Sequence, residues 1–188
     1  MSILVALGAI FMLIEVPYPL VPFLKFDLGE IVVLTTAQLF GFIPAVIVSI
    51  FKVLVHMLIF GITSPYAIGQ ITSIIASITI AALYLLAKKT FSTQTLKDIM
   101  LRCLVTIIVF SIILTICNYF FITPIYLGAL WYTDIKDTLT LASFIPWLDW
   151  DLGYAGIISV IYLPFNALKG VLVLVVYELI WPRIKRVK

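Results

Sequence analysis

The sequence predicts an all-α integral membrane protein, a bundle of six transmembrane helices that forms one domain over residues 1–188. Hydrophobic residues make up 64% of the chain and charged residues 11%, whereas about a quarter of the residues in an ordinary globular domain are charged. Turn residues divide the chain into six apolar segments, and a helical span needs about 20 residues. The chain therefore has no room for a separate soluble catalytic domain.

The six predicted helices cover residues 2–16, 28–40, 44–60, 68–87, 99–122 and 154–180. The first lacks the basic start and the Ala-x-Ala cleavage site of a signal peptide, so we expect it to be retained. The second is too short to cross about 30 Å of hydrocarbon unless its ends are buried in protein. Such shortness is compatible with a helix that lines a cavity.

Basic residues indicate the orientation of the bundle. Eight of the 12 Lys and Arg residues lie after the fourth helix or in the C-terminal tail, where a six-helix bundle would bring them to one side: Lys88, Lys89, Lys97, Arg102, Arg183, Lys185, Arg186 and Lys188. The connection 123–153 carries Asp134, Asp137, Asp149 and Asp151 against a single Lys136. Because cytoplasmic loops are enriched in Lys and Arg, both termini are predicted to be cytoplasmic.

Two segments on the opposite, outer face are rich in aromatic residues and proline. They are residues 16–27 and 144–154, and the connection between the last two helices also contains Trp131, Trp147 and Trp150. These side chains form either an anchoring belt at the membrane interface or loops that close over a planar aromatic ligand. The residues alone leave both readings open.

An ionisable side chain at membrane depth is a functional candidate, because it costs several kcal/mol to bury there. Asp27 and Glu30 open the second helix, where the exposed N–H groups favour carboxylates; Asp27 also follows the aromatic segment directly and is a candidate ligand contact. Lys52 and His56 share one face of the third helix. They form either a buried network, with Lys52 bridging to Glu15 or Glu30, or a ligand contact. Lys25 and Glu178 are close enough to water for structural roles.

The sixth helix carries the strongest candidate site, in the stretch "LPFNALKG". Asn166 and Lys169 share one face, Lys169 is far from either end of the helix, and Pro164 leaves a carbonyl unpaired and kinks the axis. Asn118 near the outer end of the fifth helix is placed to face the same pocket. Further groups come from Gln70, the backbone beside Gly69, Thr35 and Thr36. Such a pocket fits a neutral, planar heteroaromatic ligand, and an anionic portion could pair with Lys169.

The sequence lacks the motifs of several classes of enzyme and of metal-binding proteins. There is no Walker motif, G-x-S-x-G elbow, H-E-x-x-H or paired carboxylate array, and no metal-ligand spacing. Cys103 and Cys117 lie too far apart on one predicted helix for a disulfide. We expect neither an enzyme nor a bound cofactor or metal, and a net charge of +3 does not suggest a nucleic-acid partner.

Four motifs together resemble one family. "PFLKFDLGEI", "FKVLVHMLIFG", Asn118-Tyr119 and "LPFNALKG" are similar to the riboflavin-specific substrate-binding subunit, the S component, of energy-coupling factor (ECF) vitamin transporters. The resemblance implies a six-helix subunit of a prokaryotic cell membrane that captures riboflavin from outside. It also implies partnership with a transmembrane coupling protein and two cytoplasmic ATPases, so that riboflavin is cargo and not a cofactor.

The resemblance also assigns roles to residues. Asn118, Asn166 and Lys169 would hydrogen-bond the flavin, joined by Thr35 and the backbone around Ala67. Small residues on the first helix would contact the coupling protein: Ser2 and Ala6 fit the spacing, and Ala9 stands beside the next position, Ile10. The alternatives are the same scaffold specific for another vitamin or for FMN, an autonomous small-molecule transporter, and a small membrane enzyme.

Overall fold

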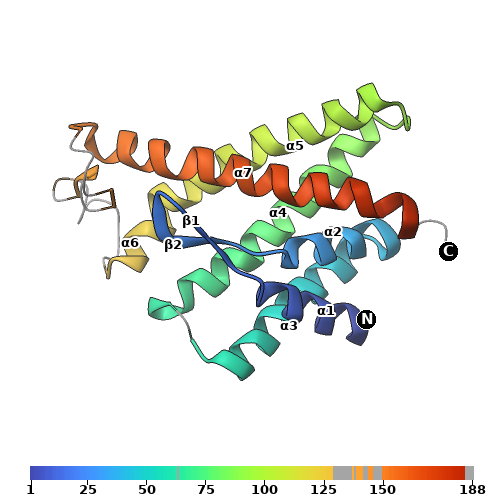
Figure 1. The fold of residues 1–188 in the computed structure, drawn as a ribbon, viewed down its shortest axis with the longest axis horizontal. Coiled ribbons are helices and arrows are strands. Elements are labelled where there is room, and N and C mark those ends of the chain that lie inside the picture. The colour runs from blue at the N-terminus through green and yellow to red at the C-terminus, as the bar shows by residue number, and fades with distance from the viewer. Residues whose placement is uncertain (63, 129–136, 138, 142–143, 146–149, 185–188) are drawn as a thin grey trace.

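The computed structural model describes residues 1–62, 64–128, 137, 139–141, 144–145 and 150–184 (Figure 1). Its elements, in chain order, are α1 (Ser2–Met12), β1 (Val16–Tyr18), β2 (Val21–Phe26), α2 (Gly29–Phe40), α3 (Phe42–Phe60), η1 (Pro65–Ala67), α4 (Ile68–Thr90), α5 (Leu96–Cys117), η2 (Asn118–Ile122), α6 (Thr123–Tyr126) and α7 (Gly153–Ile184). The all-α class is confirmed, and each of the six predicted segments overlaps one of the longer helices.

Four helical stretches are long and apolar enough to cross a membrane: Phe42–Phe60, Pro65–Thr90, Leu96–Tyr126 and Gly153–Ile184. Within the described residues, α1 and α2 are shorter apolar helices of 11 and 12 residues. The described structure thus contains four candidate spans by length and composition, where the sequence predicts six.

A two-stranded hairpin follows α1, where the sequence analysis expects helix to residue 16 and then a loop. The strands are antiparallel, with Val16 opposite Phe26 and Pro17 opposite Lys25. Proline cannot donate a hydrogen bond within a helix or a ladder, and this confines it to edges and turns. Tyr18 and Val21, which flank the hairpin turn, are buried against the start of α7. The hairpin is therefore fixed to the helix that carries Asn166 and Lys169.

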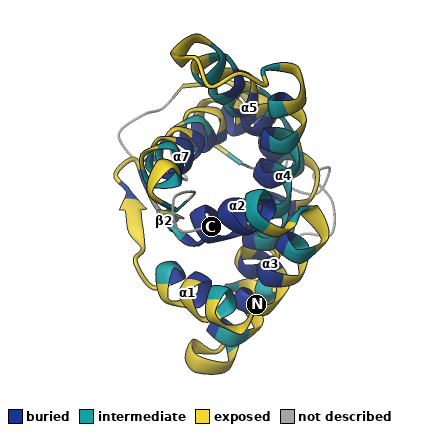
Figure 2. Ribbon diagram, turned by 90° about the vertical axis from the view of Figure 1, so that its right-hand side faces the viewer, coloured by how far each residue is buried: buried dark blue, intermediate teal, exposed yellow. Residues whose placement is uncertain are grey.

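Helix α2 lies in the interior of the bundle. Every residue from Gly29 to Ala37 is buried, and α2 contacts α1, α3, α4 and α7. Figure 2 shows α2 in dark blue with these helices around it. The expectation that protein buries the ends of a short second helix holds for its start, whereas its last residue, Phe40, is 56% exposed.

Polar side chains within the helices bond to their own backbone. The hydroxyls of Thr35, Thr36, Thr72 and Ser111 each donate to the carbonyl four residues earlier. Helix α5 starts three residues before its predicted beginning, because Thr95 caps it by accepting the Asp98 N–H at 3.3 Å. Such bonds satisfy these hydroxyls in an apolar environment.

The two ends of the bundle differ in what they contain. The N-terminus, the end of α7 and the α4–α5 connection lie at one end, and the hairpin, α6 and the start of α7 lie at the other (Figure 1). The described basic residues Lys88, Lys89, Lys97 and Arg183 belong to the first of these ends. Lys185, Arg186 and Lys188 lie outside the described residues.

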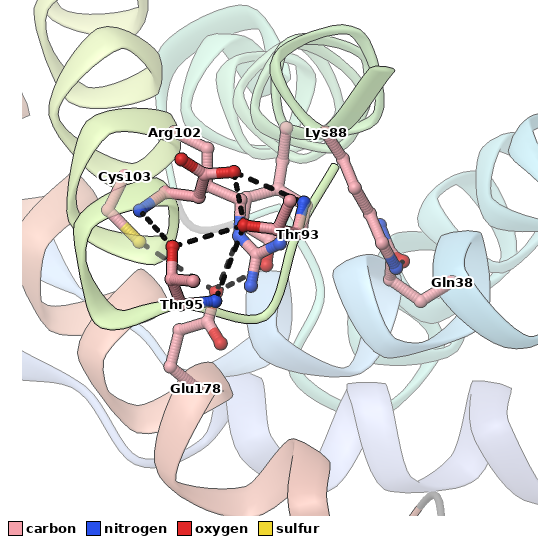
Figure 3. Close-up of polar contacts among 9 residues, drawn as sticks. Gln38, Lys88, Thr93, Thr95, Arg102, Cys103 and Glu178 are labelled. Atoms are coloured by element: carbon pink, nitrogen blue, oxygen red, sulfur yellow. Dashed lines mark hydrogen bonds and ion pairs between the residues drawn. The ribbon is translucent and has the colours of Figure 1, made fainter. Parts of the chain in front are cut away.

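A buried ion pair joins α5 and α7 towards that same end. Arg102 is only 1% exposed, and its Nε donates to Glu178 Oε1 at 3.3 Å. Tyr84 of α4 also donates to Glu178 Oε1, and the Arg102 guanidinium lies 5.5 Å from the Tyr84 ring centre. Figure 3 shows Arg102 and Glu178 directed toward each other. Arg102 is thus an interior cation and not a charge of the connecting loop, and Glu178 binds it within the bundle.

Candidate functional site

A cavity of about 290 Å³ opens at the hairpin end of the bundle. Its wall is formed by β2 and the turn before α2, the ends of α1, α3 and α5, the start of α4, the short elements η2 and α6, and the middle of α7. Among the predicted site residues, Asp27, Gln70, Asn118, Asn166 and Lys169 all line it. Its volume lies close to the lower limit of small-molecule sites.

The ammonium of Lys169 is held between two carboxylates. Its Nζ lies 3.2 Å from Asp27 Oδ2 and 2.8 Å from Glu30 Oε1. Helix α7 places Lys169 at mid-length, and the turn from β2 into α2 delivers both acids. Sequence reasoning gave Glu30 a helix-terminus role or a bridge to Lys52, and it missed Glu30 as the ion-pair partner of Lys169.

Asp27 also fixes the start of α2. Its Oδ1 accepts the backbone N–H of Gly29 at 3.0 Å, which satisfies one of the unpaired donors of the first turn. Burial alone would raise the pKa of the Asp27 carboxyl, but the ammonium groups of Lys169 and Lys52 outweigh burial and lower this pKa to about 2. Asp27 is therefore an anion at any physiological pH.

The two asparagines lie on facing helices. Asn118 Nδ2 donates to Leu114 O at 2.7 Å, and Asn166 Nδ2 lies 3.4 Å from Thr115 Oγ1. Both amides are buried, and their Oδ1 atoms have no hydrogen-bond partner among the described residues. Asn118 stands at the start of the π-helical turn η2, a distortion frequent at functional sites.

An aromatic group borders the cavity on the hairpin side. Phe165, one residue before Asn166, stacks on Phe26 with ring centres 4.9 Å apart, and Tyr18 lies 5.5 Å from Phe165. Helix α7 continues through Pro164, whose missing N–H leaves a carbonyl of the preceding turn without its usual donor. The stretch "LPFNALKG" thus supplies apolar surface, an amide and a cation to the same wall.

The start of α4 approaches the cavity in an unusual backbone conformation. Tyr66 and Ala67 both have left-handed φ angles, of 51° and 55°, which is rare for residues other than glycine. Ser64 Oγ donates to Gln70 Oε1 and accepts from Gly69 N, each at 2.8 Å. These bonds order Gln70 at the cavity wall.

Two predicted ligand contacts do not line the cavity. Thr35 is buried within α2, where its hydroxyl is committed to Ile31 O at 2.8 Å. Ala67 precedes the lining residues Ile68, Gly69 and Gln70. The structure therefore brings Asn118, Asn166 and Lys169 together, but it does not bring Thr35 or Ala67 to the cavity surface.

The structure separates the roles of Lys52 and His56. His56 lines the cavity, and its Nδ1 has no hydrogen-bond partner among the described residues; the same is true of Ser73 Oγ in the cavity wall. Lys52 is fully buried behind the wall. The suggested bridge from Lys52 to Glu15 is absent, because Glu15 pairs with Lys25 at the cavity mouth. Ser73 was not singled out in the sequence, where no periodicity distinguishes it.

The small residues of α1 do not all lie on one surface. Ser2 and Ala6 are exposed, together with Ile10 and Leu13, whereas Ala9 is 5% exposed and packs inside the bundle. Of the outer tryptophans, Trp150 is 57% exposed, and Trp131 and Trp147 lie outside the described residues.

Comparisons with known proteins agree with this geometry. Residues 1–181 match the family described as "ECF transporter, substrate-specific component". The chain is 26% identical over 186 residues to riboflavin transporter FmnP of Bacillus subtilis (strain 168), with 98% of this chain and 89% of the relative covered. It is 27% identical over 185 residues to riboflavin transporter RibU of Staphylococcus aureus (strain TCH60), with 97% and 87% covered.

One solved structure, described as the S component of a bacterial ECF transporter, has the same fold. It superposes with a TM-score of 0.68 at 24% identity, and the match covers 98% of this chain and 92% of that one.

Proposed function

The chain belongs to the family of ECF transporter substrate-specific components, and we propose that riboflavin is the substrate it binds. Family membership makes it a membrane transport subunit and not an enzyme. The specificity for riboflavin rests on the similarity to two riboflavin transporters and on the chemistry of the cavity.

The observation that carries the proposal is the convergence of Asn118, Asn166 and Lys169 on one cavity next to stacked aromatic rings. The isoalloxazine ring is planar and apolar on its faces, with carbonyl, ring-nitrogen and N–H groups along one edge. Amides and an ammonium match such an edge, and aromatic rings match the faces. The ribityl chain needs several polar partners, and the polar side chains of His56, Ser73 and Gln70 lie in the same wall.

The direct test is binding of riboflavin to ligand-stripped protein in detergent. We expect the protein to quench riboflavin fluorescence at a 1:1 ratio, and freshly purified protein to carry a yellow chromophore. Folded protein that leaves the fluorescence unchanged would rule out riboflavin as the substrate.

We also propose an orientation in the cell membrane. Lys88, Lys89, Lys97 and Arg183 lie at the end that holds the N-terminus, the α4–α5 connection and the end of α7, so the positive-inside rule would put that end in the cytoplasm and the cavity mouth outside. Riboflavin would then enter from outside in a prokaryotic, multi-pass membrane protein. Labelling of cysteines introduced singly at Ser2 and Asp151 in intact cells tests this, because only Asp151→Cys should react with an impermeant reagent.

ATP-driven uptake would require partners, namely a transmembrane coupling protein and two cytoplasmic ATPases. The exposed face of α1 with Ser2 and Ala6 is the proposed contact with the coupling protein, because small residues let helices approach closely in a membrane. Ala9 is not part of this surface. Uptake into vesicles that requires all subunits supports this assembly, whereas uptake by the chain alone would indicate an autonomous transporter.

The nearest alternative is the same cavity with a different specificity. Lys169 is already paired with two carboxylates, which disfavours the phosphate of FMN at this position. A competition series with FMN, thiamine and riboflavin separates these possibilities, and we expect riboflavin to displace the others.

A further inference from the structure

Lys52 is a buried cation to which the proposed binding mode gives no role. It is 0% exposed, and its Nζ has no hydrogen-bond partner among the described residues. An isolated ammonium in such a place is costly unless opposite charges lie nearby. The surroundings of Lys52 should therefore contain an excess of negative charge.

Two glycines make room for this side chain. A Cβ on Gly8 of α1 would stand 3.2 Å from Lys52 Cβ, and a Cβ on Gly29 of α2 would stand 2.8 Å from Lys52 Nζ. The side chain thus passes from α3 between α1 and α2 and ends at the first residue of α2. A Cβ at Gly29 would therefore force the ammonium of Lys52 to shift.

The excess negative charge lies at the same place. Asp27 Oδ1 stands 3.0 Å from the position of that Gly29 Cβ, and the other oxygen of Asp27 binds Lys169 at 3.2 Å. Lys169 also binds Glu30 at 2.8 Å. Asp27, Glu30, Lys52 and Lys169 form a buried four-charge cluster, with two anions and two cations.

We propose that Lys52 is a positioning residue that balances the second carboxylate of the four-charge cluster and thereby keeps Lys169 able to bind a ligand in the cavity. This inference rests on the proposed function for the ligand, riboflavin, but its electrostatic part concerns the protein alone. Without Lys52, two carboxylates would share one ammonium. Lys169 would then be drawn fully into its ion pairs, and its remaining donor would be lost to the ligand.

Charge compensation tests this role. Lys52→Met removes the cation at similar size, Glu30→Gln removes one anion at equal size, and the double variant restores neutrality. We expect Lys52→Met to bind riboflavin about tenfold more weakly, and the double variant to return to within about threefold of the unchanged protein. Glu30→Gln alone leaves Lys169 with one carboxylate fewer and should bind riboflavin no more weakly than the double variant does. Lys97→Met, which removes an exposed lysine, serves as the control and should bind as the unchanged protein does.

Thermal unfolding without ligand gives a second readout. Both single variants should melt at lower temperature than the unchanged protein, and the double variant should melt above each of them. A merely structural lysine predicts the reverse, since the second substitution would add to the damage of the first.

Each result decides one question. Losses that add in the double variant, in binding or in melting, would overturn the role of Lys52. Failure of the unchanged protein to bind riboflavin would overturn the proposed substrate instead. The melting temperatures would still show whether Lys52 balances the charge of the carboxylates. If Lys52→Met does not fold, recovery of a folded protein by Glu30→Gln in the same chain supports the balance, and failure to recover it contradicts the balance.

Discussion

Lys169 Nζ lies 3.2 Å from Asp27 Oδ2, although 142 positions separate the two residues in the chain. The contact ties the middle of α7 to the turn between β2 and α2. Because Asp27 also accepts the Gly29 N–H, the same carboxylate holds the start of α2 and one wall of the cavity. Binding of a ligand at Lys169 is therefore linked to the position of the hairpin and of α2.

Replacing Asp27 by Asn should weaken riboflavin binding by about 1–3 kcal/mol, the usual effect of losing a charged hydrogen-bond partner. The ammonium of Lys169 would move toward Glu30 and away from the ligand. Fluorescence titration measures the change. Asp151→Asn removes an exposed carboxylate and should leave the affinity as it is, and equal losses in the two variants would argue against a specific role for Asp27.

Replacing Asn118 or Asn166 by Ala should weaken binding by about 1–3 kcal/mol each, if their amides face the flavin edge. Neither amide oxygen has a partner among the described residues, so the loss of affinity should exceed the loss of stability that comes from removing the Nδ2 contacts with Leu114 and Thr115. Gln94→Ala removes an exposed amide and is the control. An unchanged affinity in both variants would mean that Asn118 and Asn166 serve to pack α5 against α7 and do not bind the flavin.

The sequence predicted the helices well, because their signals are local. The helical segments could be predicted from long apolar runs and prolines. The cost of burying a central lysine indicated that "LPFNALKG" lines a polar cavity, and neither inference required knowledge of which helices pack together. The Val16–Phe26 hairpin was not predicted from the sequence, because its strands are short and its apolar residues do not alternate regularly with polar ones. Its burial against α7 is a tertiary effect.

Charge pairing could not be predicted for the same reason. Glu30 had a sufficient local explanation at a helix start, yet its partner Lys169 comes from the far end of the chain. Arg102 resembled a loop cation by position, but Glu178 and Tyr84 hold it inside the bundle. A periodic pattern shows which face of a helix is polar. Only the packing of the helices shows which charged side chain of another helix pairs with a residue on that face.

Replacing Arg102 by Met should lower the free energy of unfolding by about 2–4 kcal/mol, because Glu178 would remain partly buried without its cation. The double variant with Glu178→Gln should recover part of this loss. Melting in detergent measures both. Since the Arg102–Glu178 pair does not belong to the cavity wall, riboflavin affinity should remain unchanged in whichever variants fold, and a large change in affinity would mean that the two ends of the bundle are coupled.

Two substitutions on α1 should have opposite effects, because Ala6 and Gly8 lie on opposite faces of this helix. Gly8→Leu would push against the Lys52 side chain, which lies 3.2 Å from the position of a Gly8 Cβ, and should weaken riboflavin binding by about tenfold through the four-charge cluster. Ala6→Leu would enlarge an exposed position and should leave riboflavin binding unchanged while it reduces co-purification with the coupling protein. Titration of the isolated chain and pull-down of the assembled transporter measure the two effects separately. Weakened binding in Ala6→Leu, or normal binding in Gly8→Leu, would contradict this division of α1 into an inner face that supports the cavity and an outer face that meets the partner.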